Sequence, residues 1–296
     1  MDDICTATAV GRGVFDPDCV YIVGSLRTGS ANAGIVFHPE RPTDYAGAAY
    51  FALSNAVIRP TDGRLLYETS AKEEPGDPDP SGYKLFTYLG PSSPNASLEA
   101  RERVPGIVCD GSFRQGFWVF PDDGAVLYDC DDALMVAGTA APIYRGDARP
   151  IAPAYGRAVL AMQSPRRFVW IRDGVASDVD AIEGDFHALR ARPSGSMWLA
   201  SSRWRDEKLV SELYEIAPNG SIRVLGEYQN ADDPRWGIPG NACALEPDQS
   251  LVCRFTTTAD TIDRVFRLTF TEKPVMIFDE SLHEQKIHGG GLITGP

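Results

Sequence analysis

A short segment near the middle of the chain brings together three side chains that could act on a ligand. Glu183, Asp185 and His187 occupy alternate positions, so an extended backbone would place all three on one face. A histidine changes its charge near neutral pH and can serve as a base or as a metal ligand. The sequence therefore suggests His187 and Glu183 as candidate catalytic groups. A histidine that is hydrogen-bonded for structural reasons alone is the alternative.

The same segment could also contribute to a metal site. Carboxylate and amide oxygens suit a divalent cation. Glu183, Asp185 and Asn241 are the candidate ligands, and calcium or another divalent cation is the candidate cofactor.

Polar residues recur at a fixed distance ahead of four prolines. The positions six residues before Pro60, Pro121, Pro193 and Pro247 are all polar, and so are several neighbours of these positions. If each proline marks the same turn of a repeated unit, these side chains converge on a common channel. The predicted ligand-binding positions are Ser54, Asn55, Arg114, Gln115, Asp185, His187 and Asn241. Ordered water is the alternative occupant of such a channel.

These prolines belong to a repeat that runs through the chain. Each copy reads as an apolar strand, a proline, two turn residues and a second apolar strand, and a second hairpin usually follows it. The anchors are Pro17, Pro60, Pro121, Pro153, Pro193 and Pro247. Their spacing averages about 46 residues, which suits one four-stranded propeller blade. We therefore predict a single all-β domain over residues 1–296, a six-bladed β-propeller of four-stranded blades around a central channel.

Two segments depart from the regular repeat. The interval between Pro60 and Pro121 is the longest, and it contains a polar, proline-rich stretch at 72–82 that we expect to be an exposed loop. This irregularity leaves five or seven blades as alternatives. A ring also needs its last strand to pair near its first, and residues 288–294 are the expected closing segment.

The best-defined copies of the repeat resemble a known group of propellers. Residues 186–200 and 213–220 resemble repeats of the NHL and virginiamycin-B-lyase-like propellers. The wider likeness is to the six-bladed group that includes strictosidine-synthase-like and gluconolactonase-like proteins. The resemblance implies the fold and widens the range of functions. Gluconolactonase-like enzymes bind calcium at the channel, but this chain does not match all of those ligand positions, so no ligand set is carried over.

The cysteines indicate the compartment. There are six and none has CxxC spacing, which favours disulfides over zinc or buried free thiols. Cys243 and Cys253 flank a turn between two apolar strands, so a hairpin would place them opposite each other. Proximity in sequence pairs Cys109 with Cys130 and Cys5 with Cys19, although other pairings stay open. Disulfides imply a secreted, periplasmic or cell-surface protein, and we expect an export segment to have preceded Met1.

Charge and motif content narrow the partners. The formal net charge is −13, with no cluster of Lys and Arg, so we expect no nucleic-acid partner. No apolar run approaches the length of a transmembrane helix, and no nucleotide-binding, metalloprotease or esterase motif occurs. Arginine outnumbers lysine by 23 to 5, a bias associated with bacterial genomes rich in G and C.

Three functions fit these observations. The preferred one is an exported binding module that presents its loops or funnel to a protein, peptide or glycan. The alternative is a lactonase-like hydrolase or a lyase, with a metal-assisted site in the funnel where His187 moves the proton. A purely structural propeller within a surface assembly is the third.

Overall fold

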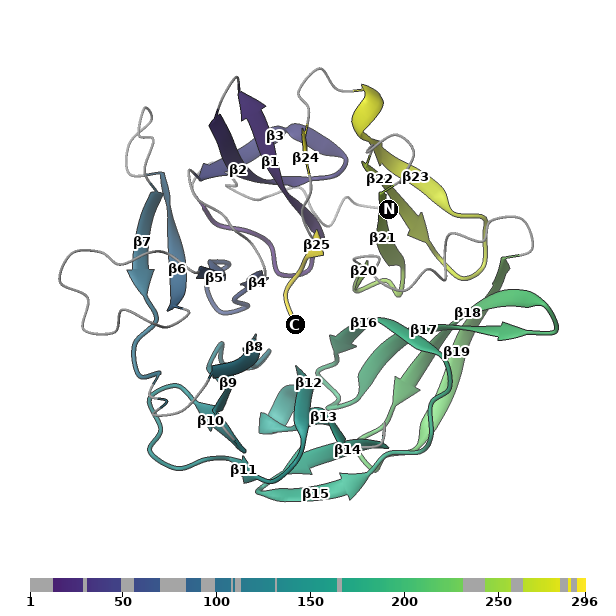
Figure 1. Cartoon of the computed structure of the whole chain (residues 1–296). Coiled ribbons are helices and arrows are strands. Elements are labelled where there is room, and N and C mark those ends of the chain that lie inside the picture. Colours follow the sequence, from purple (N-terminus) through teal and green to yellow (C-terminus); the bar gives the residue numbers. More distant parts are fainter. Residues whose placement is uncertain are drawn as a thin grey trace.

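The strands of this chain surround a common centre. The computed structural model describes residues 13–28, 31–48, 56–69, 84–91, 99–107, 109, 113–130, 132–163, 167–230, 243–256, 263–282, 287–288 and 292–296. Within these ranges the strands form six antiparallel sheets, which stand around the centre as the blades of a β-propeller (Figure 1). No helix in the described ranges is long and apolar enough to cross a membrane.

Each blade is one stretch of sequence, apart from the blade that contains both ends of the described chain. That blade consists of β1 (Tyr21–Thr28), β2 (Ala31–His38), β3 (Arg41–Ala48), β24 (Ile287–His288) and β25 (Leu292–Ile293). The next blade consists of β4 (Ala56–Ile58), β5 (Leu65–Thr69), β6 (Lys84–Pro91) and β7 (Glu99–Arg103). The blade after it consists of β8 (Phe113–Val119), β9 (Val126–Cys130), β10 (Ala133–Val136) and β11 (Tyr144–Arg145).

The remaining three blades follow in sequence. The first consists of β12 (Arg149–Pro153), β13 (Val159–Gln163), β14 (Arg167–Arg172) and β15 (Val175–Asp178). The second consists of β16 (Asp185–Ala191), β17 (Met197–Arg205), β18 (Lys208–Ile216) and β19 (Ile222–Asn230). The third consists of β20 (Cys243–Leu245), β21 (Leu251–Thr256), β22 (Asp263–Leu268) and β23 (Val275–Asp279). The first strand of each is the innermost, and the last forms the outer edge (Figure 1).

One blade departs from the predicted form. Five sheets in the described part of the chain have four strands, whereas the β1 sheet has five because β24 and β25 both pair with β1. The prediction of six four-stranded blades is therefore wrong, since only five blades have that form among the described residues. The fifth strand arises because the closing segment pairs with β1 at two separate places, β24 with Ser25 and Leu26 and β25 with Tyr21 and Ile22.

The prolines lie at the predicted turns. Five of the six anchors lie in the turn between the first and second strands of a sheet, or at the last residue before that turn. They are Pro60, Pro121, Pro153, Pro193 and Pro247. Backbone hydrogen bonds close these turns, such as Arg192 N–H to the Ser196 carbonyl at 2.9 Å and Glu246 N–H to the Ser250 carbonyl at 2.9 Å. Proline fits there because its fixed φ presets the bend.

Pro17 has a different role because it lies where the ring closes. Its carbonyl accepts a hydrogen bond from Gly295 N–H at 2.9 Å. Nearby, Tyr21 pairs with Ile293 and Ile22 with Leu292, which confirms the expected pairing of the C-terminal segment with the first strands.

The core lies between neighbouring blades. The β12–β15 and β16–β19 blades share a cluster that includes Trp170, Met197 and Tyr214, and the indole N–H of Trp170 donates to the Ala217 carbonyl at 3.0 Å. The hairpin between β18 and β19 turns at Gly220, whose φ is +86°. A Cβ there would lie 2.2 Å from the Asp178 carbonyl oxygen of the neighbouring blade, so only glycine fits.

Candidate functional site: a polar blade beside a disulfide

The β16–β19 blade buries polar side chains on both of its faces. Side chains alternate along a strand. Ser202 and Ser211 lie on the face of Ala200 and Leu213, which packs against the β20–β23 blade. Glu212 lies on the opposite face, which packs against the β12–β15 blade. The three polar side chains are at most 2% exposed, and buried polar groups are tolerated only when they are hydrogen-bonded.

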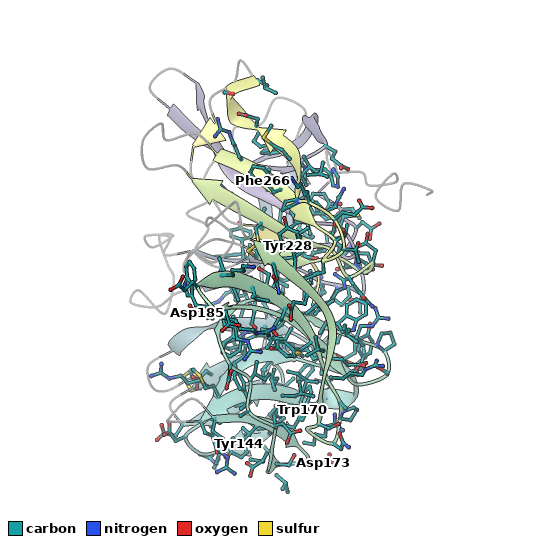
Figure 2. The ribbon with its side chains drawn as sticks, turned by 90° about the vertical axis from the view of Figure 1, so that its right-hand side faces the viewer. Tyr144, Trp170, Asp173, Asp185, Tyr228 and Phe266 are labelled. Atoms are coloured by element: carbon teal, nitrogen blue, oxygen red, sulfur yellow. A yellow bond between two sulfur atoms is a disulfide. The ribbon has the colours of Figure 1, made fainter. Side chains whose placement is uncertain are left out.

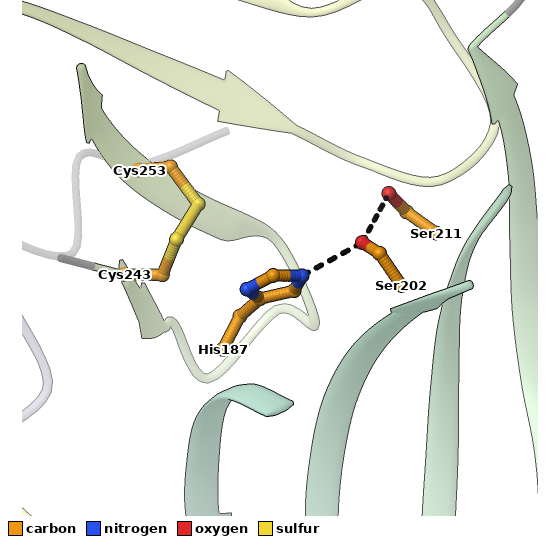
Figure 3. Close-up of a disulfide and its surroundings, with 5 residues drawn as sticks. All are labelled: His187, Ser202, Ser211, Cys243 and Cys253. Carbon is orange, nitrogen blue, oxygen red and sulfur yellow. Dashed lines mark hydrogen bonds between the residues drawn. A yellow bond between two sulfur atoms is a disulfide. The ribbon is translucent and has the colours of Figure 1, made fainter. Parts of the chain in front are cut away.

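His187 is set into this blade by a β-bulge in the innermost strand. Phe186 pairs with Ser201 and Ala188 pairs with Ala200, so His187 is the extra residue of β16. A bulge redirects the side chain that it contains. The Nε2 atom of His187 shares a hydrogen bond of 2.7 Å with Ser202 Oγ, which lies 3.1 Å from Ser211 Oγ (Figure 3).

The surroundings of His187 favour its neutral form. Burial lowers the pKa of His187 below its usual value, and the nearby Asp185 carboxylate opposes this shift only in part. The ring is partly buried whereas Asp185 is exposed. At neutral pH the site therefore presents an uncharged imidazole beside an exposed carboxylate.

Glu183 belongs to a separate ionic network on the other face. Its carboxylate forms an ion pair with Arg203, which donates from Nη2 to Glu212 Oε1 at 3.0 Å. Arg205 also pairs with Glu212, and the Tyr214 hydroxyl donates to Glu212 Oε2 at 2.6 Å. Burial, with the hydrogen bond to Glu212, raises the pKa of Tyr214 to about 12. Glu183 therefore has a structural role, because it forms an ion pair with the guanidinium group of Arg203. The sequence did not indicate this role.

The other predicted site residues are only partly described. Arg114 and Gln115 lie in β8, which, like β16, is an innermost strand. The remaining predicted positions, Ser54, Asn55 and Asn241, lie outside the described residues. The ring of polar side chains therefore stays a prediction. Among the described residues no three His, Cys, Asp or Glu side chains are grouped to hold a metal ion.

Two of the predicted disulfides are confirmed. Cys243 and Cys253 are direct partners in the β20–β21 register, with Cα atoms 4.2 Å apart, and Cys109 is bonded to Cys130 with Cα atoms 5.7 Å apart. Cys19 is also disulfide-bonded. Its predicted partner Cys5 lies outside the described residues, so that pairing stays a prediction.

The Cys243–Cys253 disulfide lies close to the His187 site. Strands β16 and β20 contact each other, and Ala188 packs in the same cluster as both cysteines. In Figure 3 the imidazole lies between the disulfide and Ser202, with Nε2 turned to the serine and the other ring nitrogen turned to the disulfide side. Figure 2 shows Asp185 well apart from Trp170 and Asp173.

Sequence reasoning missed the residues that support His187 and Glu183. Ser202, Ser211, Glu212 and Arg203 came from no motif, and their partners are set by register and by the bulge. One signal was available: the pair at 201–202 and the pair at 211–212 interrupt otherwise apolar strands with polar residues.

Comparisons with known proteins give no family. No family model and no curated protein matches the chain. A putative oxidoreductase (glucose dehydrogenase) from Thermus thermophilus is similar in structure, with a TM-score of 0.43 and 13% identity over 87% of this chain and 98% of that one. A eukaryotic initiation factor matches with a TM-score of 0.32 and 13% identity over 98% of this chain and 68% of that one. Likenesses at this level carry no argument about the function of this chain.

Proposed function

We propose that this chain is an exported, single-domain β-propeller that binds a polar ligand at the inner end of β16. The observation that supports the proposal is the fixed, neutral imidazole of His187 beside the exposed carboxylate of Asp185. Because Ser202 fixes Nε2, the ring offers its other edge in a defined orientation. Convergent polar groups of this kind determine how a ligand is oriented in a binding site.

The chemistry of these groups limits the ligand. A carboxylate accepts hydrogen bonds, and a neutral imidazole donates from one ring nitrogen and accepts at the other. Together they suit a ligand with several hydroxyl, amide or amine groups. A glycan, a peptide or a segment of a protein meets this requirement. The net charge of −13 disfavours nucleic acid, which we do not expect to bind.

A binding screen tests this proposal. Ligand-observed NMR with monosaccharides and short peptides should identify a compound that binds the wild-type protein, and His187→Ala should weaken its affinity by about tenfold, the loss expected for one hydrogen bond in the site. Val275→Ser, on the exposed outer strand β23, should bind as the wild type does. Equal loss in both variants, or none in His187→Ala, would contradict the proposal.

A hydrolase or lyase is the second candidate. The neutral state of His187 favours it, because a base must be unprotonated at the working pH. In that reading His187 is the base, and Asp185 and Asn241 hold a divalent cation, whereas Glu183 is already paired with Arg203. The test is hydrolysis of a sugar lactone with and without added calcium. Activity that calcium raises and His187→Ala abolishes would support the enzyme over the binding module.

The proposal also includes export. It is supported by the disulfides between Cys243 and Cys253 and between Cys109 and Cys130. Disulfides persist in oxidising compartments. Thiol titration of the unfolded protein, isolated without reductant, should find no free thiol. Six free thiols would overturn the argument for export.

A further inference from the structure

We propose that the Cys243–Cys253 disulfide and His187 form a thiol–disulfide exchange site whose substrate is a small aliphatic thiol. This inference does not depend on the proposed binding function. It rests on the unequal exposure of the two cysteine residues, on the pairing of their strands, and on the position of the imidazole.

The two cysteines differ in access. Cys243 is the first residue of the innermost strand β20 and is partly exposed, whereas Cys253 in β21 is 1% exposed. An incoming thiolate therefore reaches the Cys243 sulfur first. The Cys253 sulfur becomes the leaving group and stays inside the protein. Which sulfur is attacked, and how easily it is reached, sets the rate of such exchange.

The strand pairing keeps the two sulfurs together after reduction. Next to the disulfide, Ala244 pairs with Val252 and Leu245 pairs with Leu251. These neighbours are buried and hold the hairpin without the covalent bond. The reduced cysteines therefore remain opposite each other, so the disulfide can form again without refolding.

The imidazole is placed to move the proton. When Nε2–H donates to Ser202 Oγ and the Ser202 hydroxyl donates to Ser211 Oγ, Nδ1 carries a free lone pair. Nδ1 is the nitrogen on the side of the disulfide (Figure 3). A thiol attacks as its thiolate, so a base beside the disulfide accelerates the reaction.

The exchange is balanced in two steps. In the first, His187 accepts the proton of a small thiol RSH, the RS⁻ sulfur bonds to Cys243, the Cys243–Cys253 bond breaks, and its electron pair goes to Cys253, which takes the proton from His187. In the second, another RSH attacks the R sulfur of the mixed disulfide, which releases RSSR and leaves a Cys243 thiol. Two thiols are oxidised and one protein disulfide is reduced. An external disulfide of the same class reverses both steps.

The second disulfide of the protein is a built-in control. Cys109 and Cys130 are both partly exposed, so access alone would make their disulfide at least as reactive as Cys243–Cys253. The proposal predicts the opposite: the Cys243–Cys253 disulfide should react with a small thiol faster than the Cys109–Cys130 disulfide.

The experiment uses reduced glutathione as the probe. The folded wild-type protein is incubated with glutathione at pH 7, quenched with an alkylating reagent and mapped by mass spectrometry. We expect glutathione on Cys243, little on Cys253, and an oxidised Cys109–Cys130. The Cys109→Ser/Cys130→Ser variant should react as the wild type does. Reaction at Cys109–Cys130 as fast as at Cys243–Cys253, or glutathione mainly on Cys253, would overturn the proposal.

The role of His187 is tested separately. His187→Gln can keep a hydrogen bond to Ser202 but offers no base, and it should slow the modification of Cys243 about tenfold or more. In His187→Ala, added imidazole should restore part of the rate. A wild-type rate in folded His187→Gln would remove the base from the proposal. If neither variant folds, the proposal is tested by the relative rates at which glutathione reacts with the two disulfides of the wild-type protein.

Discussion

At the scale of single residues, His187 links the predicted site to the observed one. Its pKa is lowered by burial, so the folded protein binds this proton less tightly than the unfolded chain. The free energy of unfolding should therefore fall as the pH drops through the usual histidine pKa of about 6.5, and level off below the pKa of the folded state. In His187→Gln this part of the pH dependence should vanish, so the stability difference between the two proteins narrows at low pH.

The titration of His187 can be measured directly. NMR of the imidazole resonances should give a midpoint below about 6.5. A midpoint at or above that value would show that Asp185 outweighs burial.

Glu212 should be the most costly carboxylate to remove from the β16–β19 blade. It is 1% exposed and binds Arg203, Arg205 and Tyr214. Glu212→Gln keeps the size of the side chain but leaves the two guanidinium groups without their shared anion. Because these arginines are partly solvated, we expect a loss of about 1–3 kcal/mol in urea unfolding. Glu272→Gln, on an exposed turn, should change stability by less than about 0.5 kcal/mol.

The sequence was informative at this scale where the constraint is local. Cys243 and Cys253 were paired correctly because a hairpin leaves them one register. The bond between His187 and Ser202 could not be predicted, because the bulge at His187 shifts the alternation of β16 relative to β17. The ion pair between Glu183 and Arg203 was also missed, because sequence periodicity predicts on which face of a strand a side chain lies but not which side chain it pairs with.

At the scale of elements, Arg190 connects strands that the chain separates widely. It is 5% exposed, and its Nη1 donates to the Leu245 carbonyl at 3.1 Å and to Thr294 Oγ1 at 3.4 Å, while Nη2 pairs with Asp18. One side chain thus joins the innermost strands β16 and β20 to the two terminal segments. Burial lowers the pKa of Arg190, and Asp18 counteracts this shift.

Arg190→Met should loosen the closure of the ring. The variant fills a similar volume but loses these polar contacts, so we expect a loss of about 1–3 kcal/mol. Hydrogen exchange should speed up at the amides of β25 and β1. Arg223→Met is a suitable comparison, because Arg223 forms an exposed ion pair with Glu215 on the outer strand and should cost less than about 1 kcal/mol. Similar losses in the two variants would contradict a special role for Arg190.

At the scale of the whole molecule, the spacing of the prolines was enough to predict a propeller. The proline turn recurs in five of the described blades, so the repeat is visible without knowing any contact. The five-stranded form of the β1 sheet was less accessible, because the sequence does not show that the closing segment pairs with β1 at two separate places. The ring of polar positions stays a prediction, because Ser54, Asn55 and Asn241 lie outside the described residues.

The closing segment gives the last prediction. Strands β24 and β25 cover the inner edge of β1, so deletion of residues 287–296 leaves β1 with an unpaired edge. Exposed edge strands recruit other chains, and the loss of Thr294 also removes a partner of Arg190. The truncated protein should unfold at a lower urea concentration and elute as dimers or larger species in size-exclusion chromatography. Leu282→Ser, a full-length control at a residue that is 77% exposed, should behave as the wild type does. A monomeric truncated protein with the wild-type unfolding midpoint would mean that the closure contributes little, and that the interfaces between blades are sufficient to hold the ring.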